Sequence, residues 1–209
     1  MLRSICVGIA LAAAGTAWAD QFYLSDLLGV PSGSVATASN PPEFTIVNPS
    51  AYGIGADRPG DFAGNKIQFT GMPAFNKGVG MHSLQNGFAE IAFDLGALAP
   101  SGQAATAFHA FAGIDIGSGG FGTSEFQVLL DGVVKADVIV GAAGAPSLLV
   151  IDTTGASLLT LRTHSISHPG AHASFGDAFV TTSPVPEPST VAMLLAGAMG
   201  LLAQRRRSA

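Results

Sequence analysis

The sequence predicts an all-β domain, an antiparallel β-sandwich of jelly-roll type, flanked by an N-terminal signal peptide and a short C-terminal transmembrane helix. Two observations lead to the sandwich. Between residues 20 and 182, short runs rich in β-branched and aromatic residues alternate with Gly, Pro, Asn and Asp. No stretch of this region keeps the 3.6-residue period of an amphipathic helix. Short strands at regular spacing without helices are typical of two-sheet sandwiches.

Individual strands are placed by alternating hydrophobicity and by apolar runs. Residues 89–95 alternate strictly, so that Ile91, Phe93 and Leu95 share one face of a strand. Further strands are expected at residues 66–69, 79–82, 105–114 and 175–180. Together with the hairpin strands below, these make eight or nine. Two segments rich in Gly, Pro, Ser and Ala are expected to be long surface loops, residues 29–40 and 48–64.

Two hairpins are predicted from their turn residues. Asp131-Gly132 separates the apolar run 126–130 from the runs that follow it, and both turn residues tolerate the positive φ of a tight hairpin. A Thr-Thr-Gly-Ala turn separates residues 148–151 from 158–161, which predicts a second strand pair.

The first 19 residues form a secretory signal peptide. Arg3 supplies a positive charge, residues 5–14 are apolar, and Ala-Trp-Ala at 17–19 is a small-x-small cleavage site for signal peptidase. The mature chain is expected to begin at Asp20. Cys6 is then lost with the signal, so the domain must fold without a disulfide although it is exported.

The C-terminal segment, residues 183–209, has three parts in a fixed order. Pro186-Glu187-Pro188 stands first, an apolar stretch follows at 191–203, and Arg205, Arg206 and Arg207 come last. The apolar stretch spans roughly 21 Å as a helix, less than the ~30 Å hydrocarbon core, and can cross a membrane if the bilayer thins and the arginines snorkel. The three arginines keep the C-terminus cytoplasmic and the domain outside.

This tail closely resembles the PEP-CTERM sorting signal of exported bacterial proteins. The resemblance implies a temporary inner-membrane anchor that exosortase processes near the Pro-Glu-Pro motif. It also implies a final place at the cell surface or in an extracellular matrix, in bacteria that make exopolysaccharide and biofilm. The alternatives are a plain single-span anchor and a buried C-terminal helix, and a core helix is not expected to follow Pro-Glu-Pro and end in three arginines.

The charge of the domain excludes some partners. Of the nine basic residues, Arg3 and the three C-terminal arginines lie in the two signals, and of the fourteen acidic residues only Glu187 does. The domain between keeps a net charge of −8, which disfavours nucleic acid and anionic lipid as partners. No cofactor is expected. Structural calcium is compatible with the acidic oxygens, but no specific pattern supports it.

Six short motifs in order resemble the novel putative carbohydrate-binding module (NPCBM) family over nearly the whole mature domain. They are Tyr-Leu-Ser-Asp-Leu at 23–27, Lys-Gly-Val-Gly-Met-His-Ser at 77–83, Phe-Asp-Leu-Gly at 93–96, Ala-Gly-Ile-Asp at 112–115, Phe-Gln-Val through Asp-Gly at 126–132, and Ala-His-Ala-Ser-Phe-Gly-Asp-Ala at 171–178. The resemblance implies a lectin-like β-sandwich that binds glycans, of galactose type in some members.

The last motif departs from the family pattern Asp-His-Ala-Asp-Trp-Ala-Asp-Ala. Ala171, Ser174 and Phe175 stand where the family has two acids and the Trp, whereas His172 and Asp177 are kept. The resemblance places the ligand at strand-end loops. The residues expected to bind it are His82, Asp115, His172, Phe175 and Asp177.

Each of these residues also has an ordinary structural interpretation. His82 can be satisfied by backbone at a strand end, Asp115 can form an Asx turn, and Phe175 can belong to the core. His164, His168 and His172 lie close in sequence, but no nearby set of acidic residues or cysteines completes a zinc site, so no metal is expected.

The sequence therefore favours a non-catalytic protein that binds a glycan, associated with exopolysaccharide or biofilm matrix. The alternative is a structural or adhesive matrix protein that keeps the fold and has lost the sugar site. An enzyme is not expected, because the acidic residues are spread thinly and no Gly-x-Ser-x-Gly nucleophile motif is present.

Overall fold

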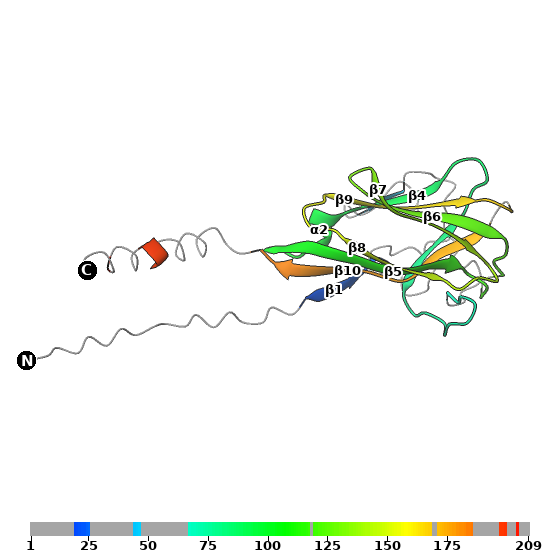
Figure 1. Ribbon diagram of the computed structural model, residues 1–209, viewed down its shortest axis with the longest axis horizontal. Helices are drawn as coiled ribbons and strands as arrows, with labels where there is room; N and C mark the ends of the chain where they lie inside the picture. The colour runs from blue at the N-terminus through cyan, green and yellow to red at the C-terminus, as the bar shows by residue number, and fades with distance from the viewer. Residues whose placement is uncertain are drawn as a thin grey trace, which may run out of the picture.

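The computed structural model shows two antiparallel β-sheets stacked face to face (Figure 1). It describes residues 19–25, 44–46, 67–117, 119–168, 171–185, 197–199 and 204. Sheet A has the order β1-β10-β5-β8, with β3 also paired to β10, and its strands are β1 (Asp20–Tyr23), β3 (Gly78–His82), β5 (Gln103–Ile114), β8 (Ser147–Asp152) and β10 (His172–Pro184). Sheet B has the order β2-β4-β9-β6-β7, and its strands are β2 (Phe44–Ile46), β4 (Ala89–Asp94), β6 (Thr123–Leu130), β7 (Val133–Gly141) and β9 (Leu158–Ser165).

The strand order confirms the predicted sandwich. Within it, β3-β10-β5-β8 faces β4-β9-β6-β7, which is the arrangement of a jelly roll built from two Greek keys. Sequence-distant strands pair in this topology, so β10 lies between β5 and the two short strands β1 and β3. The short helix α2 (Leu95–Leu98) follows β4, and Asp94 caps it by accepting hydrogen bonds from two backbone N–H groups.

The core lies between the sheets and follows from the period-2 alternation of the strands. Ile91 and Phe93 of β4 are fully buried, as the alternation predicts. They pack with Phe108 of β5, Phe126 of β6 and side chains from β9 and β10 in one continuous apolar cluster. Leu95 is also buried, but it is the first residue of α2 and not part of the expected strand, which ends one residue before it.

The Asp131-Gly132 hairpin is confirmed. Asp131 has a φ of 49° and Gly132 a φ of 81°, so both turn residues adopt the left-handed conformation that links β6 to β7. The Asp131 carboxylate also accepts hydrogen bonds from the backbone N–H groups of Ser157 at 3.0 Å and Leu158 at 2.9 Å. It thereby fastens the turn before β9 to the turn before β7.

The second predicted hairpin is wrong. β8 pairs with β5 in sheet A, whereas β9 pairs with β4 and β6 in sheet B. The turn at 153–157 therefore carries the chain from one sheet to the other, which is a connection that jelly rolls require. A turn within one sheet and a turn between two sheets use the same kinds of residue, so the local sequence does not distinguish a hairpin from a connection between sheets.

Residues 67–69 are also not a strand. They begin a coil segment, residues 67–77, that covers part of the outer face of sheet A, and its Phe69 side chain is fully buried against the sheet. Gly113 of β5 and Gly176 of β10 make room for this cover, because a Cβ at Gly113 would lie 2.9 Å from the Phe69 ring, and one at Gly176 would lie 2.8 Å from the Phe75 ring. The short strands β1 and β2 were not expected from the sequence, and the predicted loops at 29–40 and 48–64 lie outside the described residues.

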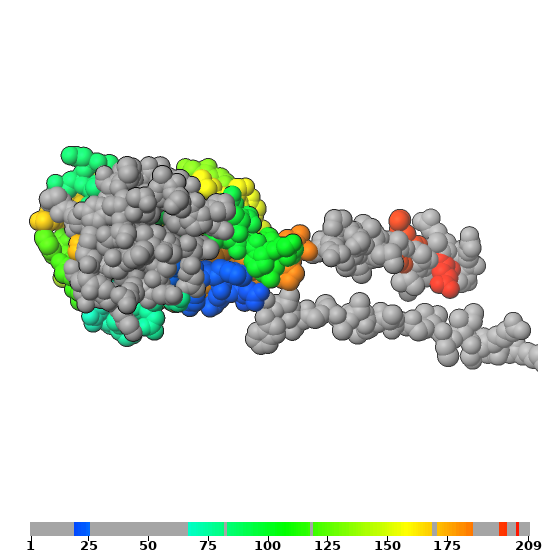
Figure 2. All heavy atoms as spheres, turned by 180° about the vertical axis from the view of Figure 1, so that it is seen from behind, coloured from blue at the N-terminus to red at the C-terminus, as the bar shows by residue number. Residues whose placement is uncertain are grey.

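Both ends of the domain lie at the same end of the sandwich (Figures 1 and 2). Asp20 of β1 is the partner of Thr182 near the end of β10, so the chain enters and leaves the domain side by side. We call this the tail end, and the opposite end, where β10 begins, the distal end. Nearly all of the predicted signal peptide and most of the predicted apolar helix lie outside the described residues. Among the residues that are described, no helix is long and apolar enough to cross a membrane.

Candidate functional site

Three of the predicted ligand-binding residues meet at the distal end. His172, the first residue of β10, is the register partner of His82, the last residue of β3. Asp115 follows β5 directly, and its backbone N–H donates to the carbonyl oxygen of His172 at 2.8 Å. The antiparallel order β3-β10-β5 therefore brings together residues that are 33 to 90 positions apart in the chain.

Within this group, Asp115 has a structural role. Its side chain is fully buried, and its carboxylate accepts hydrogen bonds from the backbone N–H groups of Gln68 at 2.9 Å and Gly117 at 3.0 Å. The first bond ties the segment covering sheet A to the end of β5, and the second forms an Asx turn. Asp115 therefore has the structural interpretation given above, in which it forms an Asx turn. Its carboxylate has no exposed surface and cannot contact a ligand from solution.

Phe175 belongs to the core, and the expectation that its ring stacks on a sugar does not hold for this structure. The side chain has 0% exposure and points between the sheets. Its ring meets that of Phe126 edge-to-face, with the centroids 5.5 Å apart. No face of the ring is open to a ligand.

Asp177 lies apart from the distal group. It is five positions further along β10 than His172, a span of roughly 16 Å. It is in an irregularity of the β10–β5 pairing, with a φ of 53°, and its backbone N–H donates to the carbonyl oxygen of Lys77 at 2.9 Å. Asp177 therefore reaches the outer face of sheet A instead of the distal end.

The three histidines that are close in sequence do not form a cluster. His164 is in β9, where its Nδ1 lies 3.0 Å from the carbonyl oxygen of Gly87, and His168 packs against Phe121 with the ring centroids 4.1 Å apart. Among the described residues, no group of three or more His, Cys, Asp or Glu could hold a metal ion.

Phe121 is a candidate that the sequence interpretation did not single out. It lies in the loop between β5 and β6 at the distal end, and 52% of its side chain is exposed. The sequence signal for Phe121 is a large aromatic residue between glycines, because glycines have no side chains that could cover the ring.

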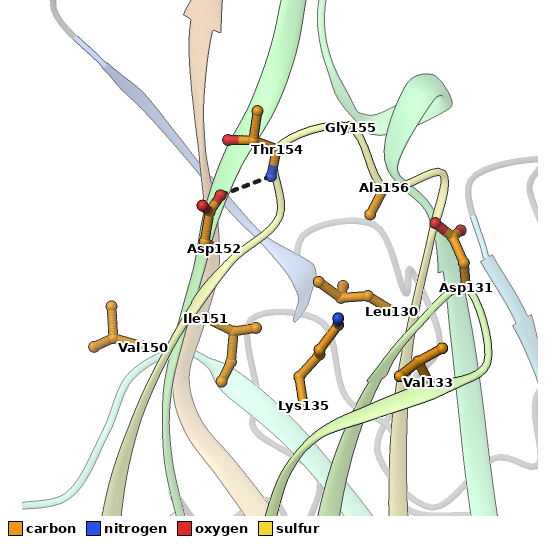
Figure 3. Close-up of a pocket in the computed structure, with 10 residues that line it drawn as sticks. All are labelled: Leu130, Asp131, Val133, Lys135, Val150, Ile151, Asp152, Thr154, Gly155 and Ala156. Atoms are coloured by element: carbon orange, nitrogen blue, oxygen red, sulfur yellow. Dashed lines mark hydrogen bonds between the residues drawn. The ribbon is translucent and has the colours of Figure 1, made fainter.

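A cleft opens at the tail end, between the β6–β7 turn and the β8–β9 turn (Figure 3). It measures about 660 Å³, and both of its carboxylates serve the turns around it. Asp131 accepts the two backbone bonds given above. The hydrogen bonds from the backbone and side chain of Thr154 hold the pKa of Asp152 below its ordinary value of 3.8. The cleft is thus the open side of the sandwich between its edge strands, and its polar groups do not converge on a ligand.

Comparison with known families identifies the domain. The profile of the NPCBM/NEW2 domain matches residues 22–181. The chain belongs to the NPCBM/NEW2 family. The profile of the PEP-CTERM protein-sorting motif matches residues 184–207, directly after the NPCBM domain. A search of curated proteins found no match.

Solved structures share the fold of the NPCBM domain. The CBM51-2 domain of Clostridium perfringens ZmpB, solved in complex with GlcNAc together with INT domains, has a TM-score of 0.56 at 22% identity, over 78% of this chain and 31% of that one. CBM51 of C. perfringens GH95, in complex with methyl-galactose, has a TM-score of 0.53 at 21% identity, over 77% and 99%. The tandem CBM51 modules of Streptococcus pneumoniae Sp3GH98 have a TM-score of 0.51 at 19% identity, over 77% of this chain and 46% of that one.

This chain spans only a small part of the length of some of these proteins. It covers 15% of a ZmpB chain that also contains an M60 catalytic domain, and 31% of another ZmpB chain. At these identities the likeness establishes the sandwich architecture and leaves the ligand of the NPCBM domain to be proposed.

Proposed function

We propose that this protein is an exported, non-catalytic carbohydrate-binding protein that is sorted by exosortase and holds exopolysaccharide of a biofilm matrix. The observation that carries the proposal is the NPCBM match over residues 22–181, followed at once by the sorting motif. The shared fold with modules solved in complex with GlcNAc and methyl-galactose supports a sugar as the ligand, and the second of these complexes supports a sugar of galactose type.

The distal end is the proposed sugar site. His172 and His82 are register partners at the ends of β10 and β3, where strand-end loops gather. We assign sugar hydroxyls to these two histidines and the apolar face of the sugar to Phe121, the exposed ring of the same end. Asp115 supports the site by bracing the loop after β5. A site with few polar groups predicts weak binding, in the ~mM range.

The position of the site suits a protein that is anchored during export. The chain enters and leaves the domain at the tail end, and the proposed site is at the opposite end. A domain held in the inner membrane by Pro186-Glu187-Pro188, the apolar helix and the arginines at 205–207 would then present its site away from the bilayer. After processing, the same domain would remain at the cell surface or in the matrix.

One observation favours the second candidate, a matrix protein without a sugar site. The family's Trp is replaced by Phe175, which is buried, and Ala171 and Ser174 stand in place of two acids. Such a protein would keep the sandwich and use it as a structural or adhesive element.

Affinity electrophoresis of the exported protein separates the two candidates. In gels containing galactan or the native exopolysaccharide, we expect retardation of the wild type and its release by free galactose. His172→Ala should lose the retardation without a change in melting temperature. His164→Ala is the matched control, because His164 belongs to β9 of sheet B and its Nδ1 lies 3.0 Å from the carbonyl oxygen of Gly87, a residue that is not part of the proposed site. A wild type that runs equally in gels with and without polysaccharide would favour the structural candidate.

A further inference from the structure

The outer face of sheet A carries a row of rings from three neighbouring strands. Phe179 of β10 is the register partner of both His109 of β5 and Tyr23 of β1. The His109 and Phe179 rings are stacked, with centroids 4.7 Å apart and planes 9° from parallel, and Tyr23 meets Phe179 edge-on at 5.5 Å. Cross-strand partners on one face are close enough to pack in this way.

The edge strand β8 extends the row. Val150 is the partner of His109 and Leu148 the partner of Phe111, and their side chains are 56% and 60% exposed. Four strands at about 4.8 Å spacing make this apolar row roughly 14 Å wide. An apolar band across a whole sheet is uncommon on the solvent side of a sandwich, where polar residues are expected to alternate outward.

A small pocket opens in this row. It measures about 180 Å³ and is lined by His109, Ala110, Phe111, Leu148, Asp177 and Phe179. Asp177 is the charged member of the lining, and its φ of 53° is rare outside glycine, although Asp tolerates it better than most residues. Within the described part of the chain, no hydrogen bond or ion pair to its carboxylate is found.

These features together match one chemical class of ligand. Flat rings and an aliphatic side chain offer an apolar surface to the C–H face of a pyranose, and a carboxylate accepts hydrogen bonds from its hydroxyls strongly. The pocket has the size of one sugar ring, too small for a helix or a strand of a protein partner. The carboxylate and the acidic domain repel uronic acids and phosphorylated sugars.

We propose that this pocket is a second saccharide subsite, which takes a neutral hexose unit of the glycan. The inference rests on the proposed function for the class of ligand, and it concerns a different place on the domain. Phe179 is seven residues from His172 along β10, a separation of roughly 23 Å. Two weak sites at that distance on one rigid sheet would hold a long polysaccharide much more tightly than a monosaccharide, because the second contact is intramolecular.

The five histidines of the chain allow one experiment to observe both sites. His109 reports on the pocket, and His82 and His172 report on the distal end. Their imidazole Hε1 signals are assigned by single His→Gln variants and followed by NMR while the full chain is titrated with galactose and then with a galactan oligosaccharide. We expect the His109 signal to shift with both probes, and Asp177→Asn to weaken this response about tenfold while the His172 response stays unchanged. Asn is the suitable substitution, because it tolerates positive φ and removes only the charge.

Asp137→Asn is the matched control, a carboxylate of sheet B that hydrogen-bonds Gln127, and it should leave every response unchanged. Shifts at His172 without shifts at His109 would overturn the second subsite and leave the proposed function intact. Shifts at His109 alone would support the subsite and remove the sugar from the distal end. No shift at any histidine would overturn both. A His109 signal that moves with protein concentration in the absence of sugar would instead assign the face to a second copy of the chain.

Discussion

At the scale of single residues, Phe175 belongs both to the last family motif, residues 171–178, and to the core of the protein. It stands where the family pattern has Trp, and it is fully buried against Phe126. Its two neighbours on the same face of β10, Ala173 and Ala178, are also fully buried, so the space around the ring is closed. A larger ring at this position must displace core atoms.

We therefore expect Phe175→Trp to lower the free energy of unfolding by ~1–3 kcal/mol through overpacking and to leave sugar affinity unchanged. Thermal melts measure the first effect and titration calorimetry with galactose the second. Phe121→Trp, at an exposed ring, is the control for the thermal melts alone and should leave the melting temperature within error, whereas its sugar affinity is free to change because Phe121 belongs to the proposed site. Tighter sugar binding by Phe175→Trp, with no loss of stability, would show that the position faces the ligand after all.

At the scale of elements, the segment 67–77 determines what the outer face of sheet A exposes. Its Phe69 and Phe75 rings cover Gly113 and Gly176, and Asp115 ties its Gln68 to the end of β5. The rings of Phe75 and Phe111 are in contact, with centroids 5.6 Å apart, so the covered part of the face continues into the exposed row. The part of sheet A around Gly113 and Gly176 is thus covered on its outer face by a small apolar layer.

Gly113→Ala tests this packing. Its new Cβ would lie 2.9 Å from the Phe69 ring, and we expect the ring to be displaced at a cost of ~1–3 kcal/mol, measured by urea denaturation. In a Phe69→Ala background the same change should cost almost nothing, because the obstructing ring is gone. Equal costs in both backgrounds would mean that the segment does not pack on β5 as described.

At the scale of the whole molecule, the sorting motif follows the tail end, and the proposed sugar site lies at the opposite, distal end. The match to the sorting motif begins at Pro184, which is the last residue of β10 and the register partner of Gln103 in β5. No long linker separates the folded domain from the motif. Processing at the motif would consequently release the domain with its final strand complete.

Replacing Pro186, Glu187 and Pro188 by alanine should leave an uncleaved, membrane-bound precursor, because the helical and extended states of the segment are no longer restricted by the two prolines. Cell fractionation and intact-mass spectrometry measure the outcome. Ser189→Ala, next to the motif, should be processed normally. If the wild-type protein recovered from the cell surface still ends at Ala209, the tail is not processed.

The sequence by itself determined the class of the fold, the hairpin at Asp131-Gly132 and the strand at 89–94, because alternation and turn chemistry are local patterns. Leu95, which was expected on the same strand, begins α2 instead. The sorting tail was also identified from the sequence, because its signal is the order of the Pro-Glu-Pro motif, the apolar stretch and the arginines. Short strands such as Phe44–Ile46 have too few residues to show a period.

Only the tertiary structure decided which segments meet. The turn at 153–157 has the same local chemistry whether it joins strands of one sheet or of two, and the pairing of β9 with β4 and β6 settled the matter. Likewise, His109 and Phe179 are 70 residues apart, and no local pattern relates them until β5 and β10 pair. Burial of Phe175 and Asp115 was decided in the same way, because the free energy of packing two sheets depends on residues from every strand at once.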